Sequence, residues 1–510
     1  MGKLVESKDT RRWILLATIL GSSLTFIDAT VVNIALPALQ ENLDANVTDV
    51  QWVIEGYALM LAALILVSGS LGDSYGRKRI FIMGVILFTG TSLWCGLAGS
   101  IQELIIARIF QGIGGALIIP SSLAILSSSF DDNERGKAIG TWSSFTAITA
   151  ALGPLLGGWL IENYSWRWIF FINLPVAVIV LYSTTKISEN RSEDRSKKLD
   201  WVGATLVTLG LGAIVYGLVE SAQLGLGSSE VITLELIGVL LIGIFLIVES
   251  KIENPMMPLK LFKSRMFSGS NVLTFFLYAA LSGAFFFFPF NLIQLQGYTA
   301  TEAGAAFLPF VILIFLLSRW AGGLVDKYGA KFPLIIGPLI VSAGYLLYAV
   351  PGIGGSYWET FFPAIVTVGI GMGISVAPLT TSVMSSVSQD HSGLASGINN
   401  AVARTAGLLA IAVMGIIVVY DFNLNLDIEL DRIEMSTELK EYINSERINL
   451  AGIQIPEGVD IETEGKIRKA INISFLSAFR MVMIISALLA LASSFTALLS
   501  ISGKKKSISE

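Results

Sequence analysis

The chain has 510 residues, of which 53% are hydrophobic and 14% charged, and its mean hydropathy is +0.70. A soluble domain carries about 25% charged residues, so this composition excludes an ordinary soluble protein and predicts one that crosses a membrane many times. A single cysteine excludes an intramolecular disulfide, a single histidine argues against a histidine-based metal site, and the net charge of −5 indicates no class of partner.

Apolar segments long enough to cross a bilayer recur along the chain, since roughly 20 apolar residues span the ~30 Å hydrocarbon core. Barrel strands would instead show about ten residues of alternating pattern, so these segments predict an all-α membrane protein with fourteen transmembrane helices. The predicted helices cover residues 13–36, 50–72, 80–99, 103–127, 138–161, 168–185, 201–220, 232–250, 267–290, 303–325, 333–351, 358–384, 397–420 and 475–502.

The distribution of Lys and Arg predicts the orientation of these helices. Most of the 34 basic residues precede the first helix, follow the last or fall in alternate links, so both termini are expected in the cytoplasm. The first apolar segment is too long for a signal peptide, which makes it an uncleaved anchor in the cell (inner) membrane. The polar stretch 421–474 is expected to be a solvated extracellular cap, with a lid or docking role as the alternative.

An internal repeat divides the chain. The sequence GSLGDSYG at 69–76 reappears as GGLVDKYG at 322–329. Two like halves around a central site are the architecture of many secondary transporters. The repeat therefore predicts an N-terminal six-helix half at 13–185, an inserted pair of helices at 201–250 and a C-terminal six-helix half at 267–502 that contains the stretch 421–474.

Eight motifs, spread over nearly the whole chain, carry a family resemblance. They are IDATVVNIALP (27–37), QWVIEGYAL (51–59), GSLGDSYGRKR (69–79), LIIARIFQGIGGA (104–116), ALGPLLGG (151–158), WRWIFFINLP (166–175), LDWVGATL (199–206) and SGLASGINNAVARTAG (392–407). In these motifs the chain resembles the fourteen-helix drug:proton antiporter branch of the major facilitator superfamily. The resemblance implies that family's fold and export in exchange for protons. The sequence has no Walker A pattern that would bind ATP, so ATP is not expected to be the energy source.

Two departures from the family pattern bear on mechanism and substrate. The second copy of the loop signature keeps Asp326 but has Ala330 where the first copy has Arg77, so its charge relay is incomplete. The segment 397–420 has Asn399, Asn400 and Arg404 but no carboxylate, which argues against doubly charged cations as substrates.

The loop signature and the ALGPLLGG motif supply the predicted gating residues. Gly69 and Gly76 permit a tight link between two helices, and by resemblance Asp73, Arg77 and Asp326 take part in closing the cytoplasmic side. The alternative is a basic loop that sets topology and an aspartate that caps a helix.

In ALGPLLGG, Pro154 removes a backbone hydrogen bond and kinks its helix, while Gly153, Gly157 and Gly158 permit close packing. The family links this motif to antiporters, and generic helix packing is the alternative.

Three charged residues are the predicted proton-coupling site. Placing a carboxylate in the middle of a membrane helix costs roughly 2.5–3.5 kcal/mol of insertion free energy. The presence of Asp28 and Glu55 in such helices therefore suggests a functional role. If they face a poorly hydrated cavity, each is costly to leave charged and empty and binds either a proton or an organic cation. The resemblance adds Arg108, which is permanently charged. The alternative for Asp28 is a packing residue bonded to Arg108, and Glu249 is expected at the membrane interface.

The substrate site is expected to include Asp28 and Glu55 together with Phe26, Asn33, Tyr57 and Trp142, for which core packing is the alternative. The predicted function is a proton-coupled antiporter that exports amphipathic, cationic drugs or toxic organic compounds by alternating access. A dedicated exporter of a metabolite, lipid or siderophore and a non-transporting membrane sensor are the alternatives. We expect no enzyme activity, no metal or cofactor and no nucleic acid, and a monomer whose partners are protons, a small organic substrate and the lipid bilayer.

Overall fold

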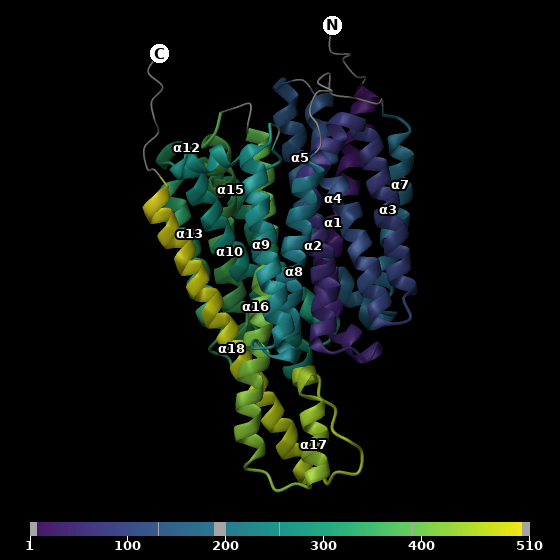
Figure 1. Cartoon of the computed structure of the whole chain (residues 1–510), viewed down its shortest axis with the longest axis vertical. Coiled ribbons are helices and arrows are strands. Elements are labelled where there is room, and N and C mark those ends of the chain that lie inside the picture. Colours follow the sequence, from purple (N-terminus) through teal and green to yellow (C-terminus); the bar gives the residue numbers. More distant parts are fainter. Residues whose placement is uncertain (1–7, 131, 188–199, 254, 389–391, 502–510) are drawn as a thin grey trace. The chain divides into compact units, whose positions relative to one another are not determined.

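The structure is a computed structural model that describes residues 8–130, 132–187, 200–253, 255–388 and 392–501. In this part of the chain every regular element is a helix, which confirms the all-α prediction (Figure 1). The elements are α1 (Lys8–Asn42), α2 (Val47–Tyr75), α3 (Arg77–Leu97), α4 (Ile101–Ser129), α5 (Asp132–Asn163), α6 (Trp168–Phe171), α7 (Asn173–Thr184), α8 (Trp201–Leu224), α9 (Ser229–Lys251), η1 (Leu259–Lys263), α10 (Arg265–Phe290), η2 (Asn291–Leu295), α11 (Ala300–Ala305), α12 (Leu308–Tyr328), α13 (Lys331–Tyr348), α14 (Tyr357–Thr360), α15 (Phe362–Ser385), α16 (Ser392–Leu430), α17 (Thr437–Ser445), η4 (Arg447–Gly452) and α18 (Ile461–Ser500).

Twelve helical stretches of the described residues are long and apolar enough to cross a membrane. The two remaining predicted segments correspond to α5 and to the shorter apolar stretch Trp168–Thr184. Each predicted segment thus has a helical counterpart, while the total of fourteen spans stays a prediction. Many of these helices expose large apolar side chains, as at Leu236, Val239 and Leu240 of α9, which are 62–66% exposed. Such faces are suited to lipid.

The stretch 421–474 is more helical than the polar sequence indicates. Helix α16 continues to Leu430 and α18 begins at Ile461, so both enter the predicted cap (Figure 1). The Asp460 side chain accepts a hydrogen bond from the backbone N–H of Thr463 and so caps the start of α18. Helix α17 lies between these two extensions in the chain and begins with a similar cap, at Ser436.

The two copies of the repeat end in the same backbone feature. Gly76 links α2 to α3 with φ of 108°, and Gly329 links α12 to α13 with φ of 81°. Side chains are disfavoured at such positive φ values, so glycine is needed at both links. The tight link predicted after the first copy of the signature is therefore present, and the second copy ends in the same way.

The first of two compact units consists of Met1–Ala35, Trp52–Ala213 and Ile237–Leu259. Its largest apolar cluster includes Leu24 of α1, Leu61 of α2, Phe88 of α3 and Ile118 of α4. Helices α3 and α4 approach closely because a Cβ atom at Gly114 would lie only 2.6 Å from the backbone nitrogen of Phe88.

The second unit consists of Leu36–Gln51, Ile214–Leu236 and Lys260–Glu510. Its aromatic core centres on Phe288 of α10, whose ring lies 4.9 Å from that of Tyr348 and 5.2 Å from that of Phe307. In the last turn of α1, the Gln40 side chain donates to the Asn449 carbonyl oxygen and accepts from Gln294, at 3.3 and 3.0 Å. These bonds join the end of α1 to η2 and η4 of the same unit.

Candidate functional site

Three long helices of the first unit carry the predicted proton-coupling residues. Asp28 lies on α1, Glu55 on α2 and Arg108 on α4, and the side chains of all three are fully buried. Arg108 is thus enclosed in the unit and does not extend to the membrane surface. Because a buried charge must find a compensating partner, the contacts of each residue decide what it can do.

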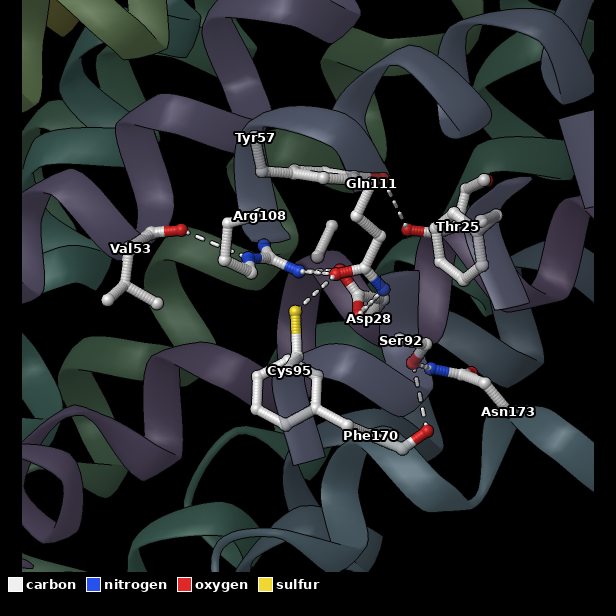
Figure 2. Close-up of polar contacts among 12 residues, drawn as sticks. Thr25, Asp28, Val53, Tyr57, Ser92, Cys95, Arg108, Gln111, Phe170 and Asn173 are labelled. Atoms are coloured by element: carbon white, nitrogen blue, oxygen red, sulfur yellow. Dashed lines mark hydrogen bonds and ion pairs between the residues drawn. The ribbon is translucent and has the colours of Figure 1, made fainter. Parts of the chain in front are cut away.

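Asp28, Arg108 and Gln111 form a closed set of hydrogen bonds, which Figure 2 shows. The Arg108 Nη1 atom donates to Asp28 Oδ2 at 2.5 Å and to Gln111 Oε1 at 2.8 Å. Gln111 Nε2 in turn donates to Asp28 Oδ1 at 2.9 Å, so both carboxylate oxygens of Asp28 are occupied. The pairing of Asp28 with Arg108, which the sequence left open as an alternative, is present.

Contacts with α2 hold the guanidinium group of Arg108 in place. Its Nε atom donates to the Val53 carbonyl oxygen at 3.0 Å, and its central carbon lies 4.3 Å from the centre of the Tyr57 ring (Figure 2). The aromatic face is attracted to the cation. Arg108 therefore joins α4 to α2 through the backbone and the Tyr57 ring, and to α1 through Asp28.

The local sequence of α4 produces this arrangement. Arg108 and Gln111 are three residues apart, which places both on one face of the helix. The next residue, Gly112, lets α4 approach α2, because a Cβ atom there would overlap the Tyr57 carbonyl oxygen. Sequence analysis missed Gln111, although its spacing from Arg108 was a signal that could have found it.

Glu55 has a different environment from Asp28. It is also fully buried, but neither carboxylate oxygen has a hydrogen-bond partner among the described residues. Burying a carboxylate without a hydrogen bond or a cation is strongly unfavourable. The site thus contains one acid group whose charge is balanced and one whose charge is not.

The other four predicted substrate residues make different kinds of contact. Tyr57 lies against Arg108, and its hydroxyl donates to the Thr25 carbonyl oxygen at 3.5 Å. Trp142 of α5 donates to Ser22 Oγ at 3.1 Å, which binds α5 to α1. Asn33 bonds the Ala29 carbonyl oxygen one turn earlier in its own helix, and Phe26 packs beside the apolar cluster of the unit. The structure thus brings only Tyr57 of these four next to the charged pair.

The described residues of the loop signature make structural contacts. Arg77 donates to the Ala124 carbonyl oxygen at 3.3 Å, so it joins the start of α3 to α4. Gly69 faces Pro120 of α4. The side chains of Asp73 and Asp326 lie outside the described part of the structure, so their predicted gating role stays a prediction.

The glycines of α5 lie directly against α1. A Cβ atom at Gly153 would overlap the Thr30 side chain, and one at Gly157 would overlap Val31. Pro154 lies inside α5 between these two positions, and Gly158 is buried. The close helix packing that the motif predicts is therefore present on α1, the helix that carries Asp28.

The second unit contains a small polar pocket. Its lining comes from α10, α15 and α16 and includes Tyr278, Thr380, Asn399 and Asn400. Asn399 is fixed there by hydrogen bonds to Asn271 and to Thr274, the latter at 2.7 Å. No carboxylate is among its lining residues, and in the described residues no three His, Cys, Asp or Glu side chains form a group that could hold a metal ion.

Charged groups buried inside long apolar helices are characteristic of membrane proteins that move solutes across the bilayer. Residues 18–411 match the family model described as Major Facilitator Superfamily. The chain belongs to this superfamily and is a multi-pass membrane transporter rather than an enzyme.

Curated relatives and solved structures agree with this assignment. The chain is 33% identical over 424 residues to the multidrug resistance protein Stp of Mycobacterium tuberculosis (strain CDC 1551 / Oshkosh). This alignment covers 82% of this chain and 78% of that protein. It is 32% identical over 409 residues to the tetracenomycin C resistance and export protein of Streptomyces glaucescens, with 79% and 75% covered. A bacterial homolog of the human lysosomal transporter Spinster, solved inward-facing and unoccupied, shares the fold with a TM-score of 0.67 at 18% identity, covering 97% and 98% of the two chains.

Proposed function

We propose that this transporter exports amphipathic organic compounds, including cationic drugs, from the cytoplasm in exchange for protons. The relatives are named for resistance to several drugs, for export of tetracenomycin C and for puromycin resistance, which supports export as the direction of transport. The observation that carries the exchange mechanism is the buried carboxyl group of Glu55, which has no partner among the described residues.

Glu55 is suited to bind two alternative ligands. A neutral carboxylic acid is tolerated in a dry interior, and a carboxylate is tolerated when an organic cation lies beside it, but an empty carboxylate is not. The same position therefore holds either a proton or a cationic substrate, and one leaves as the other arrives. Asp28 is less suited to this role by itself, because Arg108 already balances its charge.

The Asp28–Arg108 pair has a separate part in the proposal. A proton on Asp28 would end its ion pair with Arg108 and weaken the bonds that join α1 to α4. Proton binding would thus be linked to a movement between these helices. For one monovalent cation exchanged against one proton, the electrical term of ~2.3 kcal/mol per charge per 100 mV cancels, and the pH difference drives export.

The polar pocket of the second unit is a separate candidate for binding. It offers hydroxyl and amide groups, at Tyr278, Asn399 and Asn400, but no acidic group among its lining residues. We propose that it binds uncharged groups that form hydrogen bonds.

The same proposal includes the arrangement in the membrane. We propose two six-helix halves at 13–185 and 267–502, with α8 and α9 inserted between them in the chain and both termini in the cytoplasm. The matching glycine links at Gly76 and Gly329 support the assignment of two similar halves. In this arrangement, the two copies of the loop signature and the glycines of α5 act in gating.

Exchange in inverted membrane vesicles tests the function. After a pH gradient with an acidic interior is established, a cationic dye such as ethidium is expected to dissipate it in the wild type. Glu55→Gln is expected to abolish this response, because an amide takes up neither a proton nor a cation. Glu41→Gln, at an exposed position in the last turn of α1, is the matched control and is expected to behave as the wild type.

Two outcomes would refute the assignment of Glu55. One is dissipation by Glu55→Gln at the wild-type rate. The other is an equal loss of transport for a cationic dye and for an uncharged amphiphile, since the proposed attraction acts only on the cation.

A further inference from the structure

A second pair of acid groups is buried in the first unit, at the ends of helices α8 and α9. Asp200 directly precedes α8 and is 7% exposed, while Glu249 lies in the last turn of α9 and is 2% exposed. That Glu249 lies at the membrane interface stays a prediction, since burial within the protein does not fix its depth in the bilayer.

One oxygen of each carboxyl group is bonded to the backbone. Asp200 Oδ1 accepts from the Gly203 N–H at 2.8 Å, which caps the start of α8. Glu249 Oε2 accepts from the Met257 N–H at 2.9 Å, which ties the segment after α9 to the end of that helix. These backbone hydrogen bonds thus fix the orientation of both carboxyl groups.

The two other oxygens converge on one another. Asp200 Oδ2 and Glu249 Oε1 are both buried and have no hydrogen-bond partner among the described residues. Both atoms occupy the space beside Gly203, where a Cβ would overlap Asp200 Oδ2 and lie 2.8 Å from Glu249 Oε1. Two carboxylates hydrogen-bond to each other only if a proton lies between them.

The surroundings of this acid pair are apolar. Near the pair in the chain, Ala204 of α8, Phe245 of α9 and Met256 form one apolar cluster with Val67 and Leu71 of α2. Among the described side chains, Asp200 is the charged group that acts on Glu249, while Lys251 is exposed. Among the described side chains, no cation thus acts on Glu249 to balance a second negative charge.

We propose that Asp200 and Glu249 share a single proton and act as a pH-sensitive clamp that holds the start of α8 to the end of α9. With the proton present, the pair carries one negative charge, and all four carboxyl oxygens have hydrogen-bond partners. When alkaline pH removes the proton, two carboxylates face each other in an apolar space, and the clamp opens. The clamp is independent of the exchange proposed for Glu55, which lies elsewhere on α2.

Glu249→Gln is the main test, because the amide keeps an acceptor for Met257 and gives Asp200 Oδ2 a permanent donor. Purified protein in liposomes is followed by infrared difference spectroscopy and by thermal unfolding from mildly acidic to mildly alkaline pH. The wild type is expected to show a carboxylic acid band that disappears as the pH rises, with a parallel fall in the melting temperature. Glu249→Gln is expected to lose this band and to have a melting temperature that changes little with pH.

Two controls separate this pair from other acids. Glu230→Gln, at an exposed position in the first turn of α9, is expected to keep the wild-type band and pH profile. Glu55→Gln is expected to keep the part of the band and of the pH profile that Glu249→Gln removes, so that failure of the exchange proposal and failure of the clamp are distinguishable.

The clamp is overturned if the wild type has no titrating band that Glu249→Gln removes, or if the two proteins have the same pH profile of melting temperature. Asp200→Asn replaces Glu249→Gln if the latter does not fold, since its amide offers the same bond from the other side. Failure of both variants to fold would also overturn the proposal, because either amide supplies the hydrogen bond that the shared proton supplies.

Discussion

Replacing Asp28 with asparagine keeps the size of the side chain and removes one charge of its buried pair with Arg108, whose side chains are 0% and 1% exposed. The amide nitrogen also faces a donor, either Arg108 Nη1 or Gln111 Nε2, so one of the two hydrogen bonds of Asp28 is lost. Leaving one partner of a buried ion pair uncompensated costs about 3–5 kcal/mol. We therefore expect Asp28→Asn, and equally Arg108→Met, to lower the free energy of unfolding by that amount.

The double variant Asp28→Asn/Arg108→Met removes both charges together, and we expect it to lose no more stability than either single variant. The coupling energy between the two positions would then be at least about 3 kcal/mol. Reversible unfolding of the purified protein by SDS in mixed micelles measures all four free energies. As a control, Asp427→Asn breaks the exposed ion pair with Arg447, and its expected cost is at most about 1 kcal/mol. If the effects at positions 28 and 108 add to within about 0.5 kcal/mol, the two charges do not depend on each other and the reasoning fails.

Three further predictions concern other parts of the chain. Glu55→Gln is expected to leave the free energy of unfolding in the same SDS assay unchanged or raised, because an amide replaces an unpartnered acid; a loss of several kcal/mol would show that Glu55 has a partner. Gly157→Ala is expected to lower the free energy of unfolding by about 1–3 kcal/mol, because its Cβ would overlap a valine of α1. Gly140→Ala serves as the control, since a Cβ there meets nothing within 4 Å. Equal effects of the two substitutions would contradict the packing argument. In the polar stretch 421–474, the hydrogen bond from Lys440 and its charge lower the pKa of Asp431. This contact is therefore present above the ordinary pKa of an aspartate and lost as the pH falls through the lowered pKa. The protection of α17 amides against exchange, relative to unstructured peptide at the same pH, should fall there in the wild type. A Lys440→Met variant that kept the same step would argue against the contact.

The positions of the helices were open to prediction from the sequence, because a chain inside a bilayer must satisfy its backbone hydrogen bonds within each segment. Apolar length alone then indicates where a helix lies. The links at Gly76 and Gly329 were equally local, since the backbone conformation there suits glycine and little else. The ends of helices were less predictable: α16 and α18 continue through polar sequence, where contacts rather than apolar character maintain the helix.

Local sequence thus determined that this chain crosses a membrane as a set of helices, and that Asp28, Glu55 and Arg108 lie within them. Only the tertiary structure decided that Asp28 bonds Arg108 and Gln111 while Glu55 has no partner among the described residues, and that Asp200 meets Glu249. The physical reason is that hydrogen bonds along a helix depend on neighbours in the chain, whereas a side-chain pair depends on how far each helix is rotated and how closely it approaches the next. Glycines such as Gly112 and Gly203 set that approach, and their effect is visible only when the facing helix is in place.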